Sequence, residues 1–394
     1  MPIYVNGGST ADQSGSSSQN SPFVTVRICV PGSATNCIDV HGVQLDTNAS
    51  GLRIFDSAIA SLNLPAVNAT NGSPAYDCFT YPDLSYEWGS VREADLILGG
   101  EVALKVPIDV LSSAPTNVPP DCSNGGTANI NTAYVVGGKG ILGVGFEPTD
   151  CWFNGTNYCD PSYGPAPFDP AYFTCDGGAC SPAFVNIANQ VTNPVVLMQE
   201  DNNGVIVKLP AAQSPEKKMT GSLVFGIGTK RNNQLPSSAT VITLACDGFT
   251  TVLDGQTFGF SDASSCSGPY SSIDVSINGN YFPNVVNLPL CPDETPAGDL
   301  AGLYCPSTTQ NLSMMIEGQN GASKTASIGV ANADTLYTSS ATARDEVFPD
   351  LAGTLPDGSG FAVGLPFFYG KDVYISIYGQ SAPSGTPPTP WWAF

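Results

Sequence analysis

The chain has 394 residues and is strongly acidic: 13 Lys and Arg stand against 34 Asp and Glu, giving a formal net charge of -21 and a pI near 4.1. A surface of this sign repels phosphate backbones, so we expect no nucleic-acid partner. Only 12% of the residues are charged, whereas Gly (42) and Pro (33) are plentiful, which is typical of a turn-rich β protein rather than a helical one. The length suggests two or three compact units.

Strand patterns run through most of the chain. Residues 1–5 are typical of a first strand, residues 7–21 form a Gly/Ser/Gln/Asn-rich connection, and residues 23–30 alternate apolar and polar side chains at period two. After a Pro-Gly turn, residues 37–45 form another predicted strand that leads to Asp46. Later segments repeat the strand pattern: 91–98, 104–110, 195–198, 204–209, 222–227, 239–245, 326–331 and 372–378. Because helical patterns are few and short, we predict an all-β protein with long loops.

Twelve cysteines, an even number, indicate disulfides formed in an oxidising compartment. Most are close neighbours along the chain, whereas Cys78 and Cys122 remain when those neighbours are set aside; the pairing itself does not follow from the sequence. Zinc is the alternative, but the chain has no CxxC pair and His41 is its only histidine. We therefore expect neither a metal nor another cofactor.

No stretch approaches the roughly 20 apolar residues that a membrane span needs. The first residues are typical of a strand rather than a signal peptide, so we expect a mature, exported form from which the signal has been removed. Together with the cysteines, this predicts a secreted protein, either extracellular or periplasmic, with no membrane span.

One pattern occurs twice: an apolar strand, an Asp, a polar turn with Gly, and a second apolar strand. It is centred on Asp46 within residues 43–52 and on Asp274 within residues 272–279. Each half later contains an apolar, Gly-containing cluster, at residues 140–145 and 361–368, where glycine permits close approach of another backbone. A single Asp at a strand end is most simply a cap or turn residue, but the repeated order predicts two related lobes with one such Asp each.

With its motifs in this order, the chain resembles the pepsin-like aspartic peptidases. It resembles more closely a family of secreted bacterial proteins, DUF3443, which is distantly related to them. The family motifs D-T-G-S-T-G-L-R and D-S-G-S-N-G correspond to D-T-N-A-S-G-L-R at 46–53 and D-V-S-I-N-G at 274–279. Further segments resemble the flap hairpin, the I-L-G-L-G segment, the strands entering the second lobe and the aromatic terminus: 86–91, 140–145, 201–207, 220–226 and 391–394.

The resemblance implies an all-β, bilobal pepsin-like fold, with two β-barrel-like lobes at 1–200 and 201–394 and a cleft between them. It also implies that Asp46 and Asp274 are a catalytic pair sharing one proton, in which one carboxylate activates a water and the other carboxyl protonates the substrate carbonyl.

The residues after each Asp depart from the family pattern of a bracing hydroxyl, a Gly and a donating Ser or Thr. Thr47 keeps the first bracing hydroxyl. Asn48 and Ser276 occupy the two Gly positions, and since Asn tolerates a left-handed backbone, we expect the first turn to survive. The pattern's hydroxyls are missing at three positions: Ala49, Val275 and Ile277.

Two hypotheses of function follow. In the first, the protein is an aspartic endopeptidase that hydrolyses polypeptides beneath a flap carrying Tyr86 or Trp88. In the second, it is a catalytically inactive relative that binds an extracellular protein or assembles with itself, through edge strands such as residues 1–6 and the aromatic residues 391–394.

Other chemistries fit the sequence less well. A Ser-His or Cys-His system would need His41, which lies in a predicted strand. The Gly-rich segment 137–145 lacks the Lys-Ser/Thr ending of a phosphate loop. A glycosidase could use Trp88 and Trp152 to hold sugar, but the two-lobe repeat does not favour it.

Overall fold

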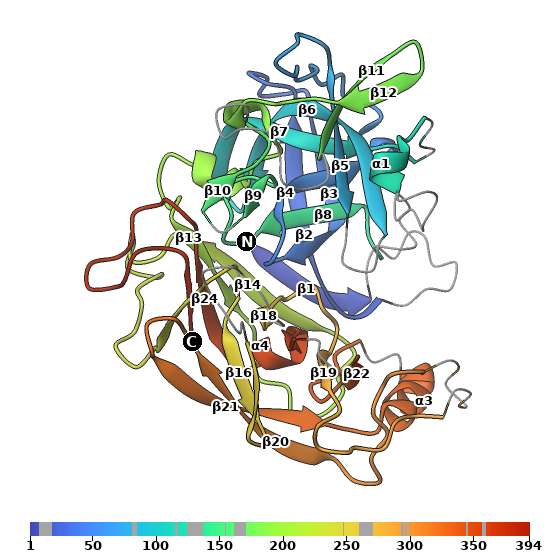
Figure 1. Ribbon diagram of the computed structural model, residues 1–394, viewed down its shortest axis with the longest axis vertical. Helices are drawn as coiled ribbons and strands as arrows, with labels where there is room; N and C mark the ends of the chain where they lie inside the picture. The colour runs from blue at the N-terminus through green and yellow to red at the C-terminus, as the bar shows by residue number, and fades with distance from the viewer. Residues whose placement is uncertain are drawn as a thin grey trace. The chain divides into compact units, whose positions relative to one another are not determined.

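The computed structural model describes the chain outside a set of short segments: 8–17, 81–84, 114, 116, 124–136, 154, 161–170, 247, 260–270, 293, 294, 296, 297, 299, 344, 345 and 357–359. Strands dominate it, and helices are few and short (Figure 1). The chain divides into two compact units. Unit 1 comprises Met1 and Val24–Asn203, and unit 2 comprises Pro2–Phe23 and Gly204–Phe394.

Unit 1 is built around one sheet with the strand order β12-β11-β5-β6-β7-β4-β8-β3-β2. Its strands are β3 Cys37–Asp46, β4 Ser50–Phe55, β5 Ala75–Thr80, β6 Tyr86–Leu98, β7 Glu101–Leu111, β8 Gly140–Val144, β9 Trp152–Phe153, β10 Thr156–Asn157, β11 Tyr172–Asp176 and β12 Ala179–Pro182. Its helices are short: η2 Asp56–Ile59, α1 Pro120–Ser123, η4 Ile187–Asn189 and η5 Pro194–Leu197. Every residue of β4 is buried, so this strand forms the centre of the unit.

Unit 2 contains three sets of paired strands, ordered β1-β14-β13-β24-β25-β15, β17-β16-β20-β21 and β18-β23-β19-β22. The strands are β1 Pro2–Gly7, β13 Gly204–Lys208, β14 Met219–Phe225, β15 Val241–Thr243, β16 Thr250–Leu253, β17 Gln256–Phe258, β18 Ser272–Ile273, β19 Asn280–Pro283, β20 Gln310–Glu317, β21 Ser323–Val330, β22 Ala352–Leu355, β23 Ala362–Val363, β24 Asp372–Ser376 and β25 Trp391–Ala393. Its helices are α3 Ala333–Ala343 and α4 Leu365–Phe368. Strand β2, Ser18–Cys29, begins in unit 2 beside β1 and ends in unit 1 beside β6.

The N-terminal segment belongs to unit 2, although the sequence placed residues 1–200 together. Strand β1 pairs with β14 on one side and β2 on the other, and this pairing carries Pro2–Phe23 into unit 2. The expectation that residues 1–6 offer a free edge is therefore wrong. The aromatic segment 391–394 is no free edge either, because β25 is buried between β24 and β15.

Four strands in each unit repeat one topology. In unit 1, β3 is parallel to β8, β8 is antiparallel to β4, and β4 is parallel to β7. In unit 2, β18, β23, β19 and β22 have the same three relations in the same order. The first and third strands of each row are consecutive in sequence: β3 and β4 in unit 1, β18 and β19 in unit 2. The loop between them begins at Asp46 in unit 1 and at Asp274 in unit 2. The internal repeat predicted from the sequence is confirmed.

Glycine lets the chain pass close behind each Asp loop, within β8 in unit 1 and directly after β23 in unit 2. Gly143 lies opposite Asp46, and an added Cβ would come 2.7 Å from the carbonyl of Ala49. In unit 2, an added Cβ at Gly364 would overlap the carbonyl oxygens of Gly279 and Ile277. These two places explain the apolar, Gly-containing clusters of the sequence.

We expect Gly364→Ala to lower the free energy of unfolding of unit 2 by about 1–3 kcal/mol, because the methyl group would meet backbone that cannot rotate away. Gly364 has a φ of -99°, so the substitution tests close packing without left-handed strain. Chemical denaturation measures the change. Gly321→Ala, at an open turn with a φ of 70°, is the control for strain alone, and a smaller loss at Gly364 than at Gly321 would refute the packing explanation.

The structure describes five disulfides, which join Cys29–Cys37, Cys78–Cys122, Cys151–Cys159, Cys175–Cys180 and Cys291–Cys305. The pair left over in the sequence, Cys78 and Cys122, is thus joined. Cys246 is also disulfide-bonded, and Cys266 lies outside the described residues.

Candidate functional site

The Asp46 loop holds its carboxylate by backbone donors. The N–H groups of Asn48 and Ala49 donate to Asp46 Oδ1 at 2.7 and 2.6 Å. The second of these bonds comes from a residue whose side chain has no donor. Backbone N–H groups form short, strong hydrogen bonds with a carboxylate. Asp46 Oδ1 therefore has two donors although Ala49 carries no hydroxyl.

The first turn is formed with Asn48 in the Gly position, and it needs no left-handed residue there, since Asn48 is described and is not among the residues with positive φ. The Asp46 side chain instead shapes the turn by accepting bonds from the backbone two and three residues ahead, as Asp does in Asx turns. The buried Thr47 lies within this turn.

The Asp274 loop uses one residue twice. Ser276 donates its N–H to Asp274 Oδ1 at 2.9 Å and its hydroxyl to Oδ2 at 2.6 Å. The hydroxyl absent at Ile277 is therefore replaced by one at the neighbouring position. Sequence reasoning treated Ser276 only as a residue in place of Gly and missed this bond. Val275 is fully buried, so its apolar side chain serves packing.

Each loop is hydrogen-bonded to the residues that follow the second strand of its row, β8 or β23. In unit 1, Gly145 N–H donates to Ala49 O at 2.9 Å, and the Ser50 hydroxyl donates to Glu147 O at 2.7 Å. In unit 2, Leu365 N–H donates to Ile277 O at 2.7 Å. Backbone and side-chain hydrogen bonds thus hold both Asp loops to neighbouring segments.

Asn20 supports the Asp274 loop from a distant part of the sequence. Its side-chain amide donates to Asn278 O and to Phe348 O, both at 2.7 Å. Its side-chain oxygen accepts from Phe348 N–H at 2.6 Å and from the Tyr369 hydroxyl at 2.8 Å. The Gly/Ser-rich segment around it gave no signal for this role, because its partners lie more than 250 residues away.

The two flap candidates lie in the core of unit 1. Trp88 is 3% exposed, stacks on Tyr76 with ring centroids 5.6 Å apart, and meets Phe173 edge-on. Tyr86 is buried in the same cluster. Tyr86 and Trp88 point to the same face of β6 because they lie two residues apart on the strand, and the role of either ring over a substrate stays a prediction. The loop before them, residues 81–84, lies outside the described residues.

A cavity of ≈ 440 Å³ opens beside this cluster, and Tyr76, Trp88 and Arg92 contribute to its wall.

The other sequence candidate, His41, lies in β3, where its Nδ1 is 2.9 Å from the Thr25 hydroxyl, as expected for a structural residue. Within the described part of the chain, no three His, Cys, Asp or Glu side chains are grouped as metal ligands. No helix among the described residues is long and apolar enough to cross a membrane.

Comparison with known proteins places the whole chain in one family. Residues 1–394 match the family model described as "Protein of unknown function (DUF3443)". The chain belongs to the DUF3443 family. No curated protein matches this DUF3443 chain.

Two solved structures are similar to the DUF3443 chain, and each alignment covers 95% of this chain and 92% of the other. One is an aspartic proteinase from Irpex lacteus, with 16% identity and a TM-score of 0.46. The other is Basic 7S globulin from soybean, with 12% identity and the same TM-score. The family model confirms the predicted family, and the repeated strand row confirms the predicted all-β class with two related units.

Proposed function

We propose that the protein is an aspartic endopeptidase that works in acid and uses Asp46 and Asp274 as its two carboxyls. The observation that carries the proposal is the equivalent place of the two aspartates in the repeated strand row, each with Oδ1 accepting from backbone N–H groups. Two carboxyls brought together share one proton, because like charges about 3 Å apart cannot both ionise.

The ionised carboxylate takes a proton from a water, whose oxygen bonds to the carbonyl carbon of the peptide. The protonated carboxyl gives its proton to the carbonyl oxygen. Collapse of this tetrahedral species breaks the C–N bond. The carboxyl that took the water proton gives it to the amine nitrogen, and the other carboxylate takes a proton from a hydroxyl on the tetrahedral carbon, which restores the single shared proton. The substrate class is a polypeptide. The disulfides support an exported, extracellular or periplasmic protein.

The test is hydrolysis of denatured casein between about pH 3 and pH 6, with and without pepstatin. We expect cleavage that pepstatin blocks and that either Asp46→Asn or Asp274→Asn reduces by about 10²–10⁴-fold. Asp372→Asn is the matched control, because the Asp372 side chain is 47% exposed and pairs with Lys208 on the surface. Undiminished cleavage by both variants, or no cleavage at any pH, would sink the proposal.

The second candidate is a protein that binds a polypeptide or an extracellular protein partner without cutting it. It is favoured by the loss of side-chain hydroxyls at Ala49 and Val275 and by the Ser276 hydroxyl that occupies Asp274 Oδ2. Saturable binding of pepstatin with no casein cleavage would distinguish this function from the first. Self-assembly has less support, because β1 and β25 both have partners on two sides.

A further inference from the structure

Unit 1 buries five ionisable side chains together behind the Asp46 loop. Arg53, on β4, lies at the centre: its Nε is 3.2 Å from Glu87, and its Nη2 is 3.4 Å from Asp150 and 3.8 Å from Asp77. Asp109 is fully buried and interacts electrostatically with these four. We name Arg53, Asp77, Glu87, Asp109 and Asp150 the carboxyl cluster.

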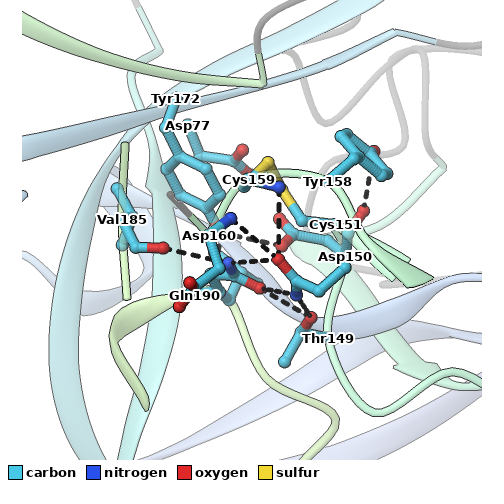
Figure 2. Close-up of a disulfide and its surroundings, with 12 residues drawn as sticks. Asp77, Thr149, Asp150, Cys151, Tyr158, Cys159, Asp160, Tyr172, Val185 and Gln190 are labelled. Atoms are coloured by element: carbon cyan, nitrogen blue, oxygen red, sulfur yellow. Dashed lines mark hydrogen bonds between the residues drawn. A yellow bond between two sulfur atoms is a disulfide. The ribbon is translucent and has the colours of Figure 1, made fainter. Parts of the chain in front are cut away.

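Four segments of unit 1 supply the carboxyls. Strands β5, β6 and β7 direct Asp77, Glu87 and Asp109 to one face of the sheet. Gly89 leaves room there, because an added Cβ would overlap the Asp109 carboxyl. Asp150 follows β8 and comes beside Asp77 next to a disulfide, as Figure 2 shows.

The cluster has too few positive charges for four carboxylates. With one guanidinium, four ionised carboxyls would carry a net charge of -3 in a site closed to water. Both oxygens of Asp109 are buried and have no hydrogen-bond partner among the described residues. An ionised carboxylate in such a place is strongly destabilising, whereas a protonated carboxyl is neutral and can donate a hydrogen bond. Charge balance therefore requires the folded cluster to hold protons.

The remaining groups around the cluster do not balance its charge. The Tyr172 hydroxyl donates to Asp150 Oδ1 at 2.8 Å, and the Tyr158 hydroxyl donates to Asp150 O at 3.2 Å (Figure 2). Burial, followed by the negative charge of Asp150, raises the pKa of both phenols, so they remain neutral. Glu147 adds a further negative charge near Tyr158.

We propose that the carboxyl cluster is a proton store that keeps unit 1 folded in acid and loosens it, with the attached Asp46 loop, as the pH rises toward neutrality. The attachment is direct, since Arg53 Nη1 donates to Ser50 O at 2.8 Å. When the protons are released, the ionised carboxylates repel one another. This repulsion disturbs the Arg53 side chain that holds the loop. This proposal concerns folding and does not depend on peptidase activity.

The direction of the pH effect follows from the proton affinities of the folded state. Burial, opposed by Arg53, raises the pKa of Asp77 from 3.8 to about 6. Burial, reinforced by Asp77, raises the pKa of Asp109 and Asp150 well above the ordinary value. Because folding takes up protons here, the stabilisation is complete below about pH 4 and is lost as the pH rises through 6 and beyond.

The test compares denaturant unfolding of the full chain with that of Asp109→Asn between about pH 4 and pH 8. In the wild type, the unfolding constant should rise about tenfold per pH unit for each proton the cluster releases. Asn mimics the neutral carboxyl and cannot release a proton. The slope of the unfolding constant against pH should therefore be lower in the variant by the amount that one proton contributes. Asp372→Asn on the surface should keep the wild-type slope. Parallel curves for wild type and Asp109→Asn would overturn the proposal.

A second measurement uses only the wild type and so stands even where a variant does not fold. Infrared spectroscopy at about pH 6 should show the C=O stretch of protonated carboxyls, since ordinary Asp and Glu are ionised at that pH. Hydrogen–deuterium exchange, corrected for the intrinsic effect of pH, should show β4 to β7 losing protection as this signal fades. A folded protein with no protonated carboxyl signal at about pH 6 contradicts the proposal.

Discussion

Arg53→Met is expected to lower the free energy of unfolding of unit 1 by about 3–5 kcal/mol at neutral pH. The substitution removes the cation on which Asp77, Glu87 and Asp150 converge. It also removes the donor to Ser50 O that fastens the Asp46 loop. In acid the loss should be smaller, because protonated carboxyls no longer need the guanidinium. Chemical denaturation at about pH 4 and pH 7 measures both values.

Arg27→Met is the matched control for this prediction. Arg27 is 42% exposed and pairs with the exposed Asp39, so solvent and salt screen the interaction. We expect a change of about 1 kcal/mol or less at either pH. If Arg53→Met costs no more than Arg27→Met at neutral pH, the buried charges do not govern the stability of unit 1.

Asn20→Ala is expected to lower the free energy of unfolding of unit 2 by about 3–5 kcal/mol. The change removes four side-chain hydrogen bonds and leaves the buried backbone of Phe348 and the Tyr369 hydroxyl without these partners. It also forces Ala into the φ of 53° that Asn20 adopts. Through Asn278 O, the Asp274 loop should lose order, which hydrogen–deuterium exchange of residues 274–279 would report.

Asn20→Gly separates the two causes, because Gly accepts a positive φ without strain. It should be more stable than Asn20→Ala by about 1–2 kcal/mol and still less stable than the wild type. Wild-type stability in Asn20→Gly would mean that the side-chain hydrogen bonds contribute nothing.

The strand content and the internal repeat could be predicted because both depend on local patterns. Period-two alternation identified most strands, and the recurrence of the Asp turn in 43–52 and 272–279 identified the repeated row. The segment 195–198 was wrongly predicted as a strand. Asn193 caps a 3-10 turn there by accepting from Val195 N–H, and Pro194 begins it. Local hydrogen bonds thus decided between two conformations that the apolar run allows.

The helix α3, Ala333–Ala343, was missed because its small and polar residues carry little helical signal. Packing stabilises it instead: Leu336 and Tyr337 join a cluster with Phe348. The hydrogen bond from the Ser276 hydroxyl to Asp274 Oδ2 was also missed. It depends on the rotamer of Ser276, which the sequence does not show.

The carboxyl cluster could not be predicted, because its members come from separate segments that meet only through the sheet. One sequence signal was available. Asp77, Glu87 and Asp109 lie within strands, whereas strands normally exclude buried charge. Such residues identify candidates for buried ionisable groups, but only the register of β5 to β7 shows that they share one face.

The pairing of Asp46 and Asp274 is tested most directly by a crystal structure of the protein grown in acid with pepstatin bound. We predict that the two carboxyls lie with their nearest oxygens about 3 Å apart and that the hydroxyl of the inhibitor contacts both. Carboxyls more than about 6 Å apart, with no ligand atom shared between them, would contradict the proposed catalytic pair.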